Sequence, residues 1–154
     1  MSSHTAHIAH AIAHLRGMPS LGASGPRLPS NVKTRSIARG GLPAWKMRKV
    51  IAHVEANVSR RIPIQELARL VCLSVSHFCR AFKRTFGASP HDYIQGRRVE
   101  IAQGLMLTTP EPLSSIALRC GLCDQSHLTR VFHRIVGESP YVWRRTRRDS
   151  LNIE

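Results

Sequence analysis

The chain contains one pattern of residues twice, and the two copies lie about fifty positions apart. Residues 76–98 align with residues 126–148, with matching Ser-His, Phe, Gly, Ser-Pro and Arg-Arg positions. Residues 64–73 align with residues 113–122, and here the offset is one residue smaller than for residues 76–98. The first copy is therefore shorter by one residue, at a turn. A chain of 154 residues that repeats itself in this way is expected to form two small, similar units rather than one domain with a large catalytic cleft.

Apolar residues in both copies recur at the spacing of amphipathic α-helices, and no segment has the pattern of a strand. Capping residues mark the helix boundaries. In the first copy Ser74 and Ser89 are expected N-caps, Gly87 is an expected helix end, and Pro90 occupies a first helical position. These signals predict seven helices, over residues 44–59, 64–71, 75–86, 90–108, 113–120, 125–136 and 140–148. We therefore expect an all-α fold.

The predicted helices group into two units, at about residues 44–89 and 111–148, joined by a long linker helix over residues 90–108. At about 1.5 Å per residue that helix is roughly 27 Å long, enough to hold two small units side by side. Residues 1–42 have a His/Ala/Ile segment and then a Gly/Pro/Ser-rich segment without an apolar period. We expect them to be a flexible, disordered tail and residues 43–149 to be the folded domain.

The chain is strongly basic, with a net charge of +14. Residues 44–154 contain eighteen basic and nine acidic side chains, so the repeats are basic without the N-terminal segment. An excess of this size favours a nucleic acid or an anionic membrane surface as the partner. No apolar run approaches the roughly 18 residues of a membrane span, and the N-terminus lacks the apolar segment of a secretory signal. We expect a cytoplasmic, nucleoid-associated protein without a membrane partner.

The cysteines and histidines do not form a ligand set that is typical of a metal site. Cys120 and Cys123 make a CxxC pair, but the remaining cysteines, Cys72 and Cys79, are six residues apart and lie in the other copy. N-terminal histidines recur at helical spacing without acidic or thiol ligands, at His4, His7, His10 and His14. There is also no nucleophile with its base, no pair of carboxylates and no phosphate-binding glycine loop. We expect no metal, no cofactor, no catalytic residue and no enzymatic activity.

Each copy has the residue spacing of a helix-turn-helix motif. In the second copy a small residue is expected where the two helices cross, a glycine in the turn and leucines in the core, at Ala117, Gly121, Leu122 and Leu128. The corresponding residues of the first copy are Ala68, Cys72, Leu73 and Phe78. Cys72 thus stands where a glycine is usual, and the first turn lacks the residue that adopts positive φ most easily.

In a helix-turn-helix protein the second helix enters the major groove of DNA with its N-terminal residues toward the bases. The outward side chains of the first such helix are expected to be Val75, Ser76, Cys79, Arg80 and Lys83. Those of the second helix are expected to be Gln125, Ser126, His127, Thr129 and Arg130. Arg80 suits guanine and Gln125 suits adenine, because each can form two hydrogen bonds with that base. Side chains expected to contact phosphates are Lys83, Arg84 and Arg134.

The region from about residue 43 to 149 resembles the DNA-binding domain of AraC/XylS-type bacterial transcriptional regulators. The resemblance is clearest in the stretches IQELARLVCLSVSHFCRAFKRTFGASPHDYI and SSIALRCGLCDQSHLTRVFHRIVGESPYVWRR. It implies a seven-helix, homeodomain-like domain with two helix-turn-helix units that enter successive major grooves. The base contacts that it implies lie near Ser76, Cys79, Arg80, Gln125, Ser126 and Arg130. Many members carry a sensor or dimerisation domain before this region, so a short stand-alone member and a chain that has lost its sensor are both open.

These observations predict a sequence-specific transcription regulator, an activator, that binds an asymmetric site on double-stranded DNA as a monomer. RNA polymerase is the second expected partner. The alternative is a nonspecific nucleoid-type protein that binds nucleic acid through its net charge of +14 alone. An enzyme using the cysteines or histidines is a third interpretation, and it lacks a matching arrangement of residues.

Overall fold

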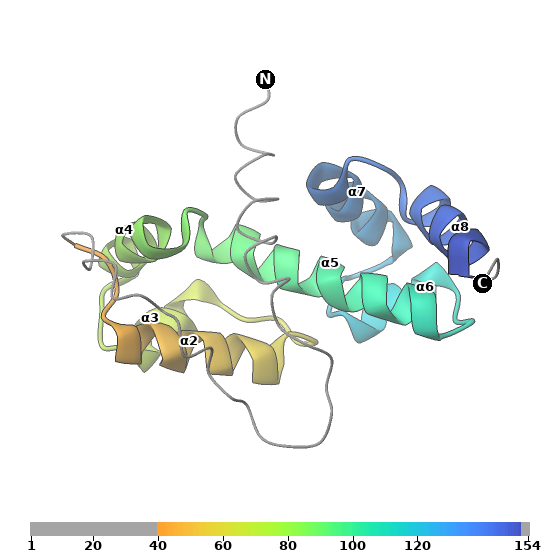
Figure 1. Cartoon of the computed structure of the whole chain (residues 1–154). Coiled ribbons are helices and arrows are strands. Elements are labelled where there is room, and N and C mark those ends of the chain that lie inside the picture. Colours follow the sequence, from red (N-terminus) through yellow and green to blue (C-terminus); the bar gives the residue numbers. More distant parts are fainter. Residues whose placement is uncertain (1–39, 152–154) are drawn as a thin grey trace, which may run out of the picture.

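The computed structural model describes residues 40–151, and this region is all-helical, as the sequence predicts (Figure 1). Within it there are seven α-helices and no strand, namely α2 (Ala44–Asn57), α3 (Ile64–Leu70), α4 (Val75–Phe86), α5 (Pro90–Thr108), α6 (Leu113–Arg119), α7 (Gln125–Val136) and α8 (Pro140–Leu151). Almost all of the predicted tail, including the N-terminal histidines, lies outside the described residues. None of the helices in this region is long and apolar enough to span a membrane.

Local capping sets the ends of the two helices that the sequence predicts to contact DNA. The Ser74 hydroxyl accepts a hydrogen bond from the backbone N–H of His77 at 3.3 Å, and the Asp124 carboxylate accepts one from the N–H of His127 at 2.7 Å. Gly87 ends α4 with a φ of 75°. The predicted boundaries of α4, α5 and α7 are confirmed. The predicted ends of the other helices differ by one to three residues, and α8 continues to Leu151 because no glycine or proline follows Arg148.

Each unit has its own apolar core. The first core is formed by Leu42, Val50, Val54, Ile62, Leu67, Ala68, Val71, Phe78, Ala81, Phe82 and Ile94. The second is formed by Val99, Ala102, Met106, Ile116, Ala117, Cys120, Leu122, Leu128, Val131, Phe132, Ile135 and Trp143. Leu42 was expected in the tail, but it is buried, and its backbone N–H donates to the Thr85 hydroxyl at 2.8 Å. The folded region therefore begins before Ala44.

Helix α5 belongs to both units rather than only linking them. Ile94, near its N-terminus, is part of the first core, whereas Val99, Ala102 and Met106 are part of the second. In Figure 1 the helix runs through the middle of the molecule, α2 lies on one side of it, α7 lies on the other, and α4 lies beside its N-terminal end. The structural repeat is thus α2–α3–α4 followed by α5–α6–α7. Helix α8 packs on the second unit in the same way as the first half of α5 packs on the first unit.

A buried arginine joins the two units. Arg98 of α5 is 7% exposed, and its guanidinium donates to the backbone carbonyl of Val58 at 3.1 Å and to that of Arg60 at 2.7 Å. Burial lowers the pKa of Arg98 below its usual value. The equivalent residue of the second copy, Arg148, donates to the carbonyl of Thr109. The second arginine of each Arg-Arg pair therefore has the same structural role, in which it donates to a carbonyl of the loop after the preceding long helix.

Candidate nucleic-acid interface

The two helix-turn-helix turns are closed by the same hydrogen bond. The backbone N–H of Leu73 donates to the carbonyl of Ala68 at 3.0 Å, and in the second unit Leu122 donates to Ala117 at 2.9 Å. Both alanines are buried where the helices cross, as predicted. The turn residue Cys72 has a φ of 54°, close to the 74° of its counterpart Gly121. The first turn therefore keeps the glycine conformation although the residue is a cysteine.

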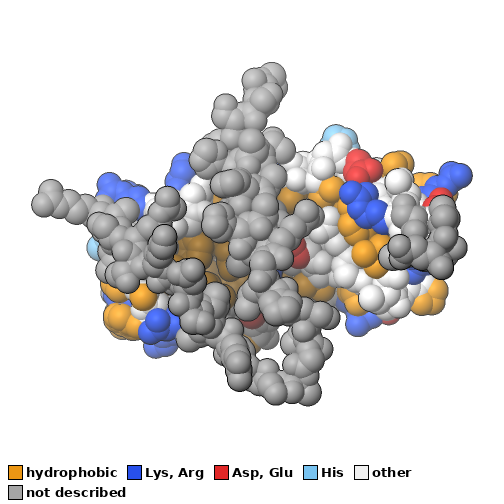
Figure 2. Space-filling model, viewed as in Figure 1, with side chains coloured by type: hydrophobic (Ala, Val, Ile, Leu, Met, Phe, Trp, Pro, Cys, Tyr) orange, Lys and Arg blue, Asp and Glu red, His pale blue; other side chains and the backbone are white. Residues whose placement is uncertain are grey.

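Helices α4 and α7 each bury one side and expose the other. Phe78, Ala81 and Phe82 of α4 are buried as predicted, and Leu128, Val131 and Phe132 are buried in α7. In Figure 1 α4 lies beside the N-terminal end of α5 and α7 lies beside its middle. In Figure 2 lysine and arginine side chains are visible at both ends of the molecule.

Most of the predicted contact residues of α4 are open to solvent. The exposed ones are Val75, Ser76, Arg80, Lys83 and Arg84. Cys79 differs, because it is half-buried and packs against the first core. The open surface of α4 is therefore formed by its N-terminal turn and by the basic side chains along the helix.

The predicted contact residues of α7 divide in the same way. The exposed ones are Gln125, Ser126, Arg130 and Arg134, while His127 and Thr129 are half-buried. His127 accepts a hydrogen bond at Nδ1 from the backbone N–H of Cys123 at 3.4 Å. Arg134 forms a loose ion pair with Asp92 of α5, with 3.8 Å between the guanidinium and the carboxylate.

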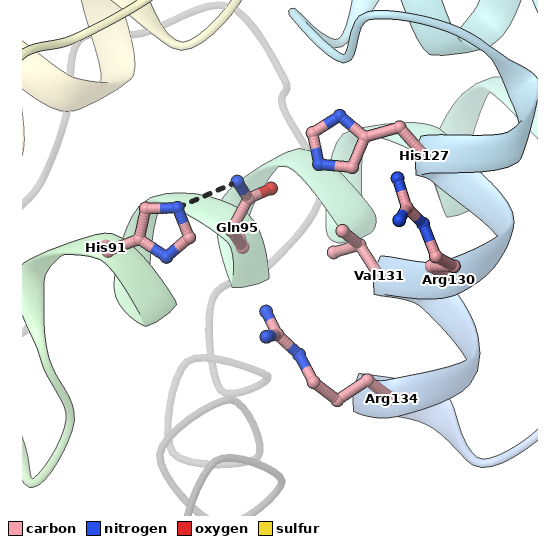
Figure 3. Close-up of a pocket in the computed structure, with 6 residues that line it drawn as sticks. All are labelled: His91, Gln95, His127, Arg130, Val131 and Arg134. Atoms are coloured by element: carbon pink, nitrogen blue, oxygen red, sulfur yellow. Dashed lines mark hydrogen bonds between the residues drawn. The ribbon is translucent and has the colours of Figure 1, made fainter.

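A cavity of about 400 Å³ lies between α7 and the N-terminal half of α5 (Figure 3). The residues that line it are His91, Gln95, His127, Arg130, Val131 and Arg134. The sequence singled out His127, Arg130 and Arg134, but not the two residues from α5. No sequence signal marks His91 and Gln95, because they meet α7 only through packing between helices that are distant in the chain.

The cysteine side chains are free thiols with different environments. Cys72 and Cys123 are exposed, Cys79 is half-buried, and Cys120 is buried in the second core. Burial raises the pKa of the Cys120 thiol to about 11, so it is protonated at neutral pH. No group of three metal-ligating side chains occurs within residues 40–151.

Each of the two units contains a helix-turn-helix motif with an exposed second helix, and both units share α5. The chain is therefore a tandem helix-turn-helix protein. Residues 67–146 match the family model described as a helix-turn-helix domain. The chain is 33% identical over 88 residues to the probable transcriptional regulator LumQ of Photobacterium leiognathi, covering 57% of this chain and 36% of LumQ. It spans about a third of the length of several curated regulators that it matches.

Two solved structures are similar over nearly all of their own length. The DNA-binding domain of AdpA, solved in complex with a target DNA, has a TM-score of 0.65 and 27% identity, covering 68% of this chain and 95% of that chain. A probable AraC family transcriptional regulator from Rhodopseudomonas palustris CGA009 has a TM-score of 0.60 and 30% identity, covering 67% and 97%. The chain belongs to the AraC family of transcriptional regulators, and the described region is its DNA-binding domain.

Proposed function

We propose that the chain is a sequence-specific transcription regulator that places α4 and α7 in two successive major grooves of one DNA duplex. The observation that supports this most directly is that α4 and α7, the second helices of the two units, each carry an exposed arginine in the first half, Arg80 and Arg130. The complex of AdpA with its target DNA shows that a domain of this fold binds duplex DNA. Such a chain acts in the cytoplasm, on the nucleoid.

The proposed contacts follow from exposure. In α4, bases are contacted by Ser76 and Arg80 beside Val75 and the flank of Cys79, while Lys83 and Arg84 bind phosphates. In α7 the corresponding base contacts are made by Gln125, Ser126, His127 and Arg130, and Arg134 binds phosphate. The half-burial of Cys79 leaves α4 with fewer side chains that reach bases. We therefore expect weaker base preference under α4 than under α7.

One chain supplies both DNA-binding helices, so the proposed complex contains a monomer on an asymmetric site. Successive major grooves on one side of B-DNA are about 34 Å apart. With about eight phosphate contacts, the logarithm of the binding constant should fall with the logarithm of salt concentration at a slope near −7. Activation, through contact with RNA polymerase, is the proposed outcome, since RhaS from Enterobacter sp., a matched relative, is a transcriptional activator.

The test is selection of bound sites from random duplex DNA with wild type, Arg80→Ala and Arg130→Ala. Each substitution should weaken binding by about 1–3 kcal/mol and relax base preference at its own positions, one helical turn apart. If both variants lose affinity uniformly with unchanged preferences, neither arginine contacts bases. If wild type binds random duplex within about tenfold of its best site, against the roughly 10³ expected of a specific protein, the nonspecific nucleoid-type alternative holds instead.

A further inference from the structure

The cavity between α5 and α7 has the chemistry of an anion site. Two guanidinium groups and two imidazoles line it, and none of its described lining residues is acidic. An acid next to the cavity is Asp92, whose carboxylate is half-buried and lies 3.8 Å from the exposed Arg134 guanidinium. Arg130 forms no ion pair within residues 40–151. Arginine presents several N–H donors in one plane, which suits the oxygens of a phosphate group.

A buried amide with an unused hydrogen-bonding atom faces this cavity. Gln95 is 4% exposed, and its Oε1 is the buried side-chain atom of the described region that has no hydrogen-bond partner. Its Nε2 lies 3.4 Å from Nε2 of His91 (Figure 3). The two ends of an amide have nearly the same shape, so a half-turn lets Oε1 accept from His91 and turns the N–H donors into the cavity. An acceptor held there would then satisfy the whole amide.

The place of the cavity between α4 and α7 suggests which acceptor occupies it. If the two helices lie in successive major grooves, the minor groove between them passes over the N-terminal half of α5. The two sugar-phosphate backbones that border this minor groove then run past His91 and Gln95. Arg134 extends from α7 toward this half of α5 in Figure 3.

We propose that this cavity binds a phosphate group, and that the group is a backbone phosphodiester at the minor groove between the two bound major-groove segments. Gln95 and His91 hold it from α5 and Arg134 holds it from α7, while Arg130 contacts a base and adds positive charge beside the site. The inference rests on the proposed function, because it requires that α4 and α7 bind one duplex. It adds a third point of attachment, provided by the shared helix itself.

The experiment combines DNA with single methylphosphonate linkages and variants of Gln95 and His91. In wild type, one neutral linkage at the central minor groove should weaken binding about tenfold, because a hydrogen bond to a charged group is lost. Gln95→Leu and His91→Ala should each weaken binding to unmodified DNA by a similar factor and should be clearly less sensitive to that linkage than wild type, because Arg134 still contacts the phosphate. Gln95→Glu should bind more weakly than Gln95→Leu, because a carboxylate of the same shape repels the phosphate.

Arg80→Ala is the matched control, because Arg80 lies on α4 and outside the cavity. It should bind more weakly but keep the full tenfold sensitivity to the central linkage. His91 is exposed, so His91→Ala tests the site without disturbing a core if Gln95→Leu fails to fold. If the neutral linkage weakens binding by the same factor in both cavity variants as in wild type, the two effects are additive and the proposal is wrong.

Two further outcomes separate the sources of the phosphate and the two proposals. If inorganic phosphate or pyrophosphate binds wild type but not His91→Ala in the absence of DNA, and the linkage scan shows no sensitive position at the central minor groove, the cavity accepts a free phosphorylated molecule and the backbone assignment is wrong. If wild type selects a two-part site while the linkage scan and the phosphate titration both fail, the phosphate site is wrong and the proposed function stands. If wild type selects no two-part site from random duplex DNA, the proposed function is wrong.

Discussion

Cys72 adopts a backbone conformation that favours glycine. It is the one non-glycine residue with positive φ within residues 40–151, and its side chain is exposed. A β-carbon in this conformation raises the free energy of the folded chain by about 1–2 kcal/mol. Replacement by glycine removes this strain, but part of the gain in stability is offset because glycine also makes the unfolded chain more flexible. We expect Cys72→Gly to raise the free energy of unfolding by about 0.5–1 kcal/mol, measured by urea denaturation. Cys72→Ala keeps the β-carbon and should be within about 0.5 kcal/mol of wild type; equal stability of the two variants would show that the first turn is not strained.

Glu66 is the centre of a charged cluster between α2 and α3. Its carboxylate accepts hydrogen bonds from Arg60 and from His53, and these two contacts, Arg60 first, lower its pKa from 4.5 to about 2. The folded-state pKa lies below the ordinary value, so the stabilising contribution is present above about pH 4.5 and is lost as the pH falls toward 2.

Glu66→Gln should therefore lower the melting temperature at pH 7 and make it less dependent on pH between about 4.5 and 2. Thermal unfolding followed by circular dichroism across this range measures both effects. Parallel curves for wild type and variant would mean that Glu66 titrates alike in the folded and unfolded chains.

At the scale of the element, α7 begins with a charged cap at the proposed DNA surface. Asp124 caps α7, whereas the neutral Ser74 caps α4. Asp124→Ala should lower the free energy of unfolding by about 1 kcal/mol, because it leaves a helix N–H without its acceptor. Asp124→Asn keeps the acceptor and removes the negative charge, so it should retain stability and bind duplex DNA more tightly. Equal DNA affinity of wild type and Asp124→Asn, measured by fluorescence anisotropy, would place α7 away from the phosphates.

The helices were predictable because their ends depend on nearby residues. Ser74, Gly87, Ser89 and Asp124 act within one turn of their own position, so the sequence predicts the boundaries of α4, α5 and α7 correctly. The half-burial of Cys79 was not predictable from helical spacing alone. It depends on how closely α4 packs against the first core, which no local signal encodes.

At the scale of the whole molecule, Gly121 marks a close backbone contact between the units. A β-carbon there would lie 2.7 Å from the backbone of Ser59 and from the carbonyl of Val58. Gly87 has nearly the same φ, 75° against 74°, but a β-carbon there meets nothing within 4 Å. Gly121→Ala and Gly87→Ala therefore share the conformational penalty and differ in the clash. We expect Gly121→Ala to be the less stable of the two by about 1–3 kcal/mol in urea denaturation. If both variants lose the same free energy of unfolding, the backbone at the contact between the units moves apart without cost.

Contacts between the units escaped sequence analysis for a physical reason. Arg98, Gly121 and the cavity beside Gln95 all join segments that are tens of residues apart, and no helical period or cap relates such segments. The repeat itself was informative about what each unit contains. It could not indicate how one unit lies against the other.

Because α5 contributes side chains to both cores, neither half of the chain can be moved into another protein as an independent unit. A cut within residues 90–108 interrupts this helix, and a cut between Ile94 and Arg98 also separates the Arg98 guanidinium from the carbonyls of Val58 and Arg60. The spacing of the two helices proposed to bind DNA is consequently set by a continuous helix and cannot be adjusted by lengthening a flexible linker. Any change in the distance between the two half-sites would have to be accommodated by the DNA, through its own twist and bend.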